Sequence, residues 1–558
     1  MRNLLFTIVL LIVGWGLIGC YNEGSQPEVL RDGEWVGSGD GRGGTIIAKV
    51  YIANHAVQQV VIVSQSESVF AQEAINTIVA KAIGRTGTMA VEVDGVTGAT
   101  LTSVGVIDAI NMAINASLGK DTGKKKYSDA SCDIVVIGAG GAGLSAAVAA
   151  AQSGELRIIV LEKQGIIGGN TNYSTGGINA AETEVQQRLG IEDSKSLFYD
   201  DIMRGGHEKN IPELVQNFVE HAPTTISWLI GLGADLSDVG LMGGSSVKRT
   251  HRPEGGKAIG PHLMQVLRQS TDIKNIEIRT SNKVIGLISK DDAVTGVEVE
   301  NYDGSVYWLQ AKAVVIATGG FGANLEMVTT LQPSLQGFAT LCHPGATGDA
   351  FEWTAAIGGA TIQMEYIQIH PTAEAKNHIL ISEAVRGNGA ILINHDAERF
   401  CNELDTRDSV SAAILRQRGG EAFLLFDHAV RESLAAIETY VNQHLLIEGQ
   451  DLDELAQKAE LPADQLKETV AAAQTLNTPP YYTVLVTPAI HHTMGGLSVD
   501  TLTRVLHQDG TPIGGLFAAG EVTGGLHGAN RLGGNGVADI VVNGRLAGLQ
   551  AAKHCTQD

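Results

Sequence analysis

The sequence predicts an α/β protein in which a small α+β unit precedes a large domain built on a parallel sheet. Glycine is abundant (68 residues), aromatic residues make up only 5%, and runs of Ala, Val and Ile recur. This composition is typical of buried parallel strands crossed by closely packed helices. Residues 132–164 read as strand, glycine turn, helix and strand, whereas residues 45–63 read as two strands joined by a turn. With 558 residues, the chain is long enough for several domains.

The first twenty residues, MRNLLFTIVLLIVGWGLIGC, have the features of an export signal. Arg2 supplies a positive charge, an apolar stretch follows over residues 4–18, and the run ends at Cys20. The ending Leu17-Ile18-Gly19-Cys20 resembles a bacterial lipobox, in which the cysteine is lipidated and becomes the new N-terminus. We therefore expect a signal peptide over residues 1–19 and a lipid anchor on Cys20. The alternative is an uncleaved N-terminal anchor, and either form exports the rest of the protein.

This signal predicts a location on the outer face of the cytoplasmic membrane, or on the periplasmic side of the outer membrane. Residues 20–30 are expected to be a linker, and residues 31–118 a small α+β unit. Within it, a turn at Asn54-His55 joins the two strands, and helix-like segments follow. The charged stretch 119–130 is expected to be a second linker, because it has no apolar periodicity.

Charge and cysteine usage exclude several classes of partner and cofactor. Acidic residues outnumber basic ones by 61 to 39, which gives a net charge of −22 and argues against a nucleic-acid partner. None of the five cysteines forms a CxxC or CxxCH motif, so no ligands for iron–sulfur clusters, c-type haem or clustered zinc are visible. We expect no metal site, and an anionic substrate would require a local cluster of Arg and His.

A dinucleotide-binding motif begins directly after the apolar strand predicted at residues 134–137. Gly138, Gly140 and Gly143 form GxGxxG, and Glu162 closes the next predicted strand. Backbone N–H groups and a helix N-terminus then face a pyrophosphate, and the acid faces a ribose hydroxyl. The alternative is a glycine-rich turn in some other α/β fold.

Three later segments resemble the flavoproteins that have two dinucleotide-binding domains and hold FAD. They are GGNTNYSTGGINA (168–180), AVVIATGGFG (313–322) and GLFAAGEVTGGLHGANRLGGN (515–535). In that family the acid of AAGE lies on the FAD ribitol. The FAD is expected to be non-covalent, because the position after the GG pair holds Asn170 and not histidine. The predicted cofactor-binding residues are Gly138, Gly140, Gly143, Glu162, Asn170, Thr171, Gly176, Gly177, Thr318, Gly319, Asp349 and Glu521.

From about Cys132 onward the chain resembles the soluble fumarate reductase flavoproteins. The motifs that carry the resemblance are EYIQIHPT (365–372), ISEAVRGNGAILIN (381–394), RFCNELDTRDSVSAAIL (399–415), VTPAIHHTMGG (486–496) and HGANRLGGN (527–535). The resemblance implies a Rossmann-like FAD-binding domain over residues 131–365 and 486–558. An inserted α+β capping domain is expected over residues 366–485.

The resemblance also implies how the site acts on a carbon–carbon double bond flanked by carboxylates. Arg531 and His491 would hold one carboxylate, while His370 and Ser382 would hold the other. Arg407 would donate the proton, refilled through Arg386 and Glu383. Hydride would come from FADH2, and a fixed cationic clamp suits the charge that develops on the carboxylate. The alternative is that Arg407 is a permanent charge of the clamp and another group protonates the substrate.

The stretch VEVDGVTGATLTSVGV (91–106) resembles the FMN-attachment segment of the flavin-carrying domains found in sodium-pumping quinone reductases. A flavin transferase would link FMN covalently to Thr100 through a phosphoester, with Thr97 and Thr102 as the fallback acceptors. The alternative is a threonine-rich turn that caps the following helix. The small unit would then be an FMN-binding domain that relays electrons to FAD. The donor would be a quinol or a reduced carrier protein at the membrane.

Other reactions are consistent with the same layout. Urocanate, acrylate and methacrylate reductases share it, but urocanate reductases replace the His of HPT with Tyr, so His370 favours a C4-dicarboxylate such as fumarate. An oxidase of the aspartate oxidase type would not need the FMN domain. A non-catalytic extracellular flavin carrier would have no use for a dicarboxylate clamp.

Overall fold

The computed structural model describes residues 29–41, 45–64, 71–89, 100–118 and 125–557, which divide into two compact units. The smaller unit ends before Lys125, and the larger one contains the rest of the chain. None of the helices in the described ranges is both long and apolar enough to span a membrane.

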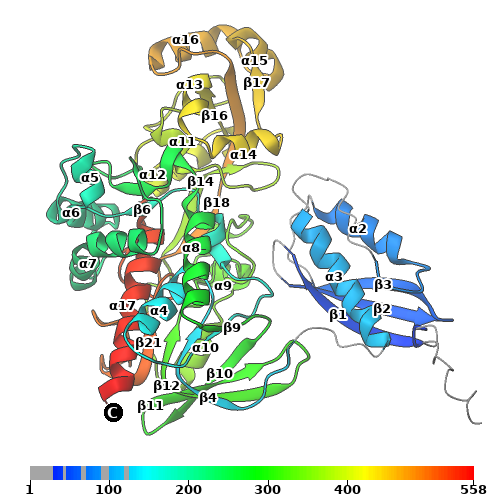
Figure 1. Ribbon diagram of the computed structural model, residues 1–558. Helices are drawn as coiled ribbons and strands as arrows, with labels where there is room; N and C mark the ends of the chain where they lie inside the picture. Colours follow the sequence, from blue (N-terminus) through cyan, green and yellow to red (C-terminus); the bar gives the residue numbers. More distant parts are fainter. Residues whose placement is uncertain (1–28, 42–44, 65–70, 90–99, 119–124, 558) are drawn as a thin grey trace, which may run out of the picture. The chain divides into compact units, whose positions relative to one another are not determined.

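The smaller unit is a three-stranded sheet with two helices (Figure 1). The strands are β1 (Gly33–Asp40), β2 (Thr45–Ala53) and β3 (Ala56–Ser64), and the helices are α2 (Ala71–Ala82) and α3 (Thr100–Ser117). The β2–β3 turn lies at Asn54 and His55, which have φ values of 54° and 62°. Strand β1 was not predicted, because its glycine-rich sequence has little strand propensity. It packs against α3 because Gly37 allows a close approach: a Cβ there would lie 2.1 Å from the carbonyl oxygen of Ala109 on α3.

The larger unit is built on an eight-stranded sheet in the order β10-β11-β21-β12-β4-β5-β9, with β20 paired to β21. Strands β21, β12, β4, β5 and β9 are parallel where they pair, and β10–β11–β12 form an antiparallel extension. The strands are β4 (Ala130–Ile137), β5 (Ile158–Leu161), β9 (Glu277–Arg279), β10 (Lys283–Lys290), β11 (Ala293–Glu300), β12 (Val306–Ile316), β20 (Arg504–Leu506) and β21 (Pro512–Ala518).

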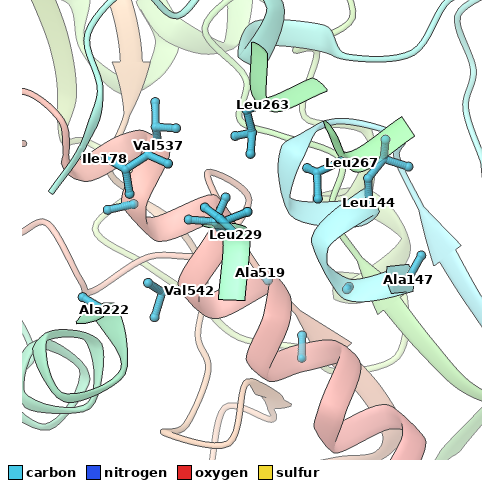
Figure 2. Packing of buried hydrophobic residues seen from close by; sticks show 14 of the residues in the cluster. Leu144, Ala147, Ile178, Ala222, Leu229, Leu263, Leu267, Ala519, Val537 and Val542 are labelled. Carbon is cyan, nitrogen blue, oxygen red and sulfur yellow. The ribbon is translucent and has the colours of Figure 1, made fainter. Parts of the chain in front are cut away.

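Helices α4 (Gly141–Gln152), α7 (Pro212–Gly231), α8 (Ile259–Ile273) and α17 (Asn535–Gln557) share one hydrophobic core with this sheet. Figure 2 shows Leu144 of α4, Leu229 of α7, Leu267 of α8 and Val542 of α17 meeting in that core. Helix α17 runs along α4 (Figure 1). Glycine residues of α17 have no side chain at the contact, so the two helix backbones can approach each other closely. A Cβ at Gly548 would lie 2.0 Å from the carbonyl oxygen of Ala146.

A second sheet, in the order β14-β18-β16-β15 with β17 paired to β18, has its own core. Its strands are β14 (Ile367–Glu374), β15 (Ile391–Ile393), β16 (Ala422–Asp427), β17 (Ile447–Gly449) and β18 (Tyr481–Thr493). Its helices are α11 (Glu383–Gly387), α12 (Arg407–Leu415), α13 (His428–Ser433), α14 (Ile437–Asn442), α15 (Leu452–Ala459) and α16 (Ala463–Ala473). Strand β18 contributes Val486 to this core and Ile490 to a core cluster of the first sheet, so it connects the two sheets, which form the two layers of the larger unit.

Shorter elements complete the larger unit. They are β6 (Ile178–Asn179), α5 (Glu184–Arg188), α6 (Lys195–Gly205), β7 (Asp238–Gly240), β8 (Thr250–Arg252), α9 (Leu325–Leu331), α10 (Asp349–Ala356), β13 (Thr361–Ile362) and β19 (Gly496–Leu497). The α/β class predicted from the sequence, with an α+β insertion and a small α+β unit ahead of it, is confirmed.

Candidate active site

The turn between β4 and α4 opens into a cleft of about 920 Å³, part of it open to solvent. The turn contributes the glycines of the GxGxxG motif, and segments from six other regions of the chain close the cleft around it. Among the predicted cofactor residues, those that line it are Gly138, Gly140, Glu162, Asn170, Thr171, Thr318, Gly319, Asp349 and Glu521.

Gly143, Gly176 and Gly177 are not among the residues that line the cleft, so their contact with the cofactor stays a prediction. A Cβ at Gly143 would lie 1.9 Å from the carbonyl oxygen of Gly138, so this glycine allows α4 to pack against the turn. A Cβ at Gly177 would lie 2.5 Å from the carbonyl oxygen of His251 on β8. The space beside Gly176 is bounded by the methyl group of Met242, 3.4 Å from its Cβ position. Gly143 and Gly177 are therefore needed for packing around the site, whereas a Cβ at Gly176 would make only an ordinary contact.

Glu162 lies at the end of β5, and its carboxylate accepts hydrogen bonds from two backbone N–H groups. Ala139 donates to Oε2 and Gln164 to Oε1, each at 2.9 Å. Burial raises the pKa of Glu162, although these N–H groups act in the opposite direction. Across the cleft, the buried hydroxyl of Thr318 has no hydrogen-bond partner among the described residues. A glycine turn, a fixed acid and an unsatisfied hydroxyl fit a bound dinucleotide such as FAD.

Glu521, the acid of the AAGE segment, lies at the other end of the cleft. Its Oε2 accepts from the Asn170 side chain at 3.1 Å, and its Oε1 accepts from the Thr493 N–H at 3.0 Å. The Nδ1 atom of His492 is 3.5 Å from Oε2. Burial raises the pKa of Glu521. Strand β18 thus brings the residues after His491 into contact with the cofactor cleft.

A cluster of buried cationic side chains lies where the two layers meet. Arg386 comes from α11, Arg407 from the start of α12, and Arg531 from the loop before α17. All three are buried, and among the described residues only Arg407 has a carboxylate, that of Glu383, within 4 Å. More distant buried carboxylates also act on the cluster, Glu403 on Arg386 and both Glu521 and Asp539 on Arg531, but Arg386 and Arg531 have no direct ion pair within the described residues. Such an arrangement is unfavourable unless an anion enters, because desolvated like charges repel.

Two of these arginines have buried nitrogen atoms without a partner in the described part of the chain. They are Nε of Arg531 and both Nε and Nη2 of Arg386. Burial, reinforced by the charge of Arg407, lowers the pKa of Arg531 to about 9, and burial also lowers the pKa of Arg386. The cluster therefore presents unsatisfied donors to whatever occupies the site.

His370 and His491 face each other within this cluster, with ring centroids 5.0 Å apart. Burial and the neighbouring guanidinium charges lower the pKa of both rings, so both are neutral at ordinary pH. The Thr372 N–H donates to Nδ1 of His370 at 3.2 Å, which places the ring proton on Nε2. His370 is thus a neutral donor suited to a carboxylate oxygen.

Ser382 is the N-cap of α11, and its hydroxyl accepts from the Ala384 N–H at 3.3 Å. Its own N–H donates to the hydroxyl of Tyr440 at 2.9 Å, and burial raises the pKa of that phenol to about 12. This capping geometry leaves the hydroxyl hydrogen of Ser382 available to another acceptor.

Glu383 and Arg407 form the central ion pair. Nε of Arg407 donates to Oε2 of Glu383 at 2.7 Å, and its Nη1 donates to the side chain of Gln368 at 3.0 Å. The other oxygen of Glu383 accepts from the Gly243 N–H at 2.7 Å. Burial raises the pKa of Glu383, but the charges of Arg407 and Arg386 outweigh it, so the pKa lies below its ordinary value. The carboxylate is ionised and in contact with the predicted proton donor.

Comparison with known proteins shows which family the chain resembles. Residues 133–537 match the model of an FAD binding domain, and residues 41–115 match that of an FMN-binding domain. Fumarate reductase (cytochrome) of Shewanella frigidimarina is 43% identical over 463 residues, which cover 79% of this chain and 81% of that protein. The chain belongs to the fumarate reductase flavoprotein family.

Two further relatives support this placement in the fumarate reductase flavoprotein family. A urocanate reductase of Eggerthella lenta is 32% identical over 96% of this chain and 93% of its own length. The solved open conformation of a flavocytochrome c3 fumarate reductase is 38% identical, with a TM-score of 0.66 over 78% of this chain and 79% of that chain. The chain is thus an FAD-dependent oxidoreductase that also carries an FMN-binding domain.

Two of the predicted sites fall outside the described residues. Cys20 lies in the segment before residue 29, and most of the predicted FMN-attachment segment lies in residues 90–99. Helix α3 begins at Thr100, whose side chain is also outside the described set. The fallback acceptor Thr102 is buried.

Several residues of this flavoprotein's site were missed by the sequence analysis. Lys163 lines the cleft and donates to Asp349 at 2.9 Å, and His343 lines the same cleft. Gln368 contacts Arg407, and Gly243 contacts Glu383. The EK dipeptide after the predicted strand is a local signal for Lys163. No local pattern marks Gly243, because its contact joins segments 140 residues apart.

Proposed function

We propose that this protein reduces the carbon–carbon double bond of fumarate to give succinate. The observation that carries the proposal is the cluster of three buried arginines, of which only Arg407 has a carboxylate within 4 Å among the described residues. A dicarboxylate dianion places negative charge beside these arginines and satisfies the free donor on Arg531. The family's relatives that are named as fumarate reductases support the same substrate.

In this proposal, Arg531 and His491 bind one carboxylate, and His370 and Ser382 bind the other. Reduced FAD, when bound, supplies hydride to one carbon of the double bond. Negative charge then develops on the other carbon of the double bond and on the carboxylate attached to it. The guanidinium of Arg531 stabilises that charge. The neutral Nε2–H of His370 holds the other carboxylate by a hydrogen bond. One end of the substrate is therefore held by a charged guanidinium and the other by a neutral donor.

Arg407 donates the proton to the second carbon, and Glu383 and Arg386 return a proton to it. An arginine acid is unusual, since the guanidinium normally keeps its proton. Two features support it here: the positive charges of Arg386 and Arg531 face Arg407, and the ionised Glu383 is 2.7 Å from Nε. Burial of the pair excludes water that would otherwise compete as a proton source.

We propose further that the reductase is exported, anchored to the membrane through Cys20, and supplied with electrons through FMN on Thr100. The FMN-binding domain match supports the second flavin. The donor would be a quinol or a reduced carrier protein, and a flavin transferase would attach the FMN.

Urocanate is the second candidate substrate, because the urocanate reductase relative matches 96% of the chain, including the FMN-binding domain. His370 favours fumarate, since urocanate reductases carry Tyr at that position. The test is oxidation of dithionite-reduced viologen by the purified protein with fumarate, urocanate, acrylate and methacrylate in parallel. We expect turnover with fumarate to exceed the others. Equal or faster turnover with urocanate would overturn the substrate assignment.

A further inference from the structure

The loop between β7 and β8, residues 241–249, donates two backbone hydrogen bonds to the segments that carry Glu383 and Arg407. The Gly243 N–H donates to Oε1 of Glu383 at 2.7 Å, and the Gly244 N–H donates to the carbonyl oxygen of Leu404 at 3.1 Å. Leu404 lies three residues before Arg407. The loop thus contacts both partners of the central ion pair, Glu383 directly and Arg407 through the segment that leads to it.

Space around Glu383 is limited on both sides of its carboxylate. A Cβ at Gly243 would lie 2.8 Å from Oε1, and a Cβ at Gly533 would lie 2.8 Å from Oε2. A shift of the loop by a fraction of an ångström would therefore either press on the carboxylate or remove its N–H donor. The position of Glu383 relative to Arg407 depends on where this loop is held.

The loop is held by Asp201 of α6, whose side chain is fully buried, and by Arg204, which pairs with Asp201 and donates to the Gly244 carbonyl oxygen at 3.4 Å and the Ser246 hydroxyl at 3.3 Å. Oδ2 of Asp201 accepts from the Ser246 N–H at 2.8 Å, and its Oδ1 accepts from the Ser246 hydroxyl at 2.6 Å. Burial raises the pKa of Asp201, but these two hydrogen bonds and the charge of Arg249 outweigh it and keep the carboxylate ionised. One carboxylate therefore binds both the backbone and the side chain of a loop residue.

Arg249, at the end of the same loop, holds Asp201 in place. Its Nη1 donates to Asp201 at 2.7 Å, while Nε and Nη2 donate to Asp193 at 3.1 and 2.9 Å. The side chains of Arg249, Asp193 and Asp201 are all fully buried. Ion pairs buried to this degree contribute little net stability, because desolvation offsets their attraction. Their specific effect here is to determine where the loop lies.

We propose that Asp201 is a positioning residue for proton transfer: it fixes loop 241–249 so that the Gly243 N–H holds the Glu383 carboxylate against Arg407. The inference rests on the proposed function and deepens it. Asp201 itself contacts neither the cation cluster nor the cofactor cleft, so it acts only through the loop.

The test compares Asp201→Asn and Ser246→Ala with Ser245→Ala in the full-length protein loaded with FAD. Ser246 is exposed, so its variant is expected to fold. Ser245 is the matched control, because the same change one residue earlier removes a buried hydroxyl without a hydrogen-bond partner among the described residues. The readouts are kcat, the KM for fumarate and the pH profile of kcat in the viologen assay.

We expect kcat to fall by about 10- to 100-fold in Asp201→Asn, because small displacements of reacting groups have effects of that size. The fall should be smaller in Ser246→Ala and absent in Ser245→Ala, with the KM for fumarate almost unchanged in all three. The acidic limb of the profile should move to higher pH. Glu383 faces Arg407, Arg386, Arg531 and the Gly243 N–H. Loss of that N–H raises the pKa of Glu383, so the carboxylate becomes protonated at a higher pH.

Wild-type protein that reduces none of the four acids would overturn the proposed function and this inference together. Wild-type activity combined with an unchanged kcat and pH profile in Asp201→Asn would overturn the inference alone. If Asp201→Asn does not fold, Ser246→Ala decides: a kcat and pH profile identical to those of Ser245→Ala would contradict the positioning role.

Discussion

The charge state of a few buried arginines determines how this site can bind an anion. Arg386, Arg407 and Arg531 are desolvated together, and in the described ranges only Arg407 pairs with a carboxylate, that of Glu383, within 4 Å. Desolvation and mutual repulsion lower the pKa of Arg531 and Arg386, whereas a lone surface arginine keeps its proton under all ordinary conditions. An incoming dianion relieves that repulsion, so binding of the substrate and full charging of the cluster favour each other.

This coupling predicts how substrate affinity changes with pH. The pKa of Arg531 is about 9, so the residue is charged below that pH and loses its charge as the pH rises through it. We expect kcat/KM for fumarate to fall above about pH 9. The value of kcat should change less, because a bound dianion raises the pKa of Arg531 and keeps it charged. Steady-state kinetics across this range measures both parameters, and a flat kcat/KM would contradict the prediction.

The proton donor gives a second prediction at the residue scale. Arg407→Ala should reduce turnover by about 10²- to 10⁴-fold, the size expected for loss of a general acid. FAD should remain bound, since Arg407 is not among the residues that line the cofactor cleft. Arg416→Ala is the control, because Arg416 is exposed at the C-cap of the same helix. Near-normal rates in Arg407→Ala, with the flavin absorbance unchanged, would mean that another group protonates the substrate.

At the scale of elements, backbone approach determines the cofactor cleft. Helix α4 begins directly after the glycine turn, and its N-terminus reaches the cleft only because Gly143 has no side chain. Helix α17 packs along α4 through glycine contacts of the same kind. The N-terminus of α4, with its partial positive charge, is therefore held rigidly at the place where a pyrophosphate would bind.

Gly143→Ala should therefore weaken FAD binding and lower stability by about 1–3 kcal/mol, as overpacking does. The added Cβ would lie 1.9 Å from the carbonyl oxygen of Gly138, so α4 must move away from the turn. Flavin content after purification and thermal unfolding measure the two effects. Gly154→Ala is the matched control, because a Cβ there meets nothing within 4 Å. Equal flavin content in the two variants would show that α4 does not need this close approach.

At the scale of the whole molecule, the chain consists of two units with separate hydrophobic cores. Within the described residues, the core clusters of the two units share no residue. The units match an FMN-binding and an FAD binding domain, respectively. This separation predicts that electron entry and substrate reduction can be disabled independently.

Thr100→Ala tests that independence. The variant should lack covalently bound FMN by mass spectrometry and lose activity with the natural electron donor. Viologen-driven reduction of fumarate should remain largely intact, because viologen delivers electrons without the small unit. Thr102→Val, which removes a buried hydroxyl but keeps the side-chain shape, should retain FMN. Retention of FMN in Thr100→Ala would exclude Thr100 as the acceptor.

Sequence alone determined the features that depend on neighbouring residues. The strand, glycine turn, helix and acid of residues 132–162 follow from local periodicity and turn chemistry, so the α/β class and the cleft residues Gly138, Gly140 and Glu162 were predicted from them. The other predicted cleft residues rest on the family resemblance. The cation cluster and the two histidines beside it were predicted only through the family resemblance, since these residues are scattered over β14, α11, α12, β18 and the loop before α17. Strand β1 and the packing role of Gly143 were not anticipated, because each depends on a close approach between backbone segments.

The tertiary structure alone decided which groups meet. Gly243 and Glu383 are 140 residues apart, and Asn170 and Glu521 are 351 apart, so no local pattern relates them. The same is true of the link from Asp201 through Ser246 to the loop that contacts Glu383. Local sequence determines which element a residue belongs to. Whether its charge is buried, paired or left free depends on segments that folding brings beside it, and the pKa of each group in this site follows from that environment.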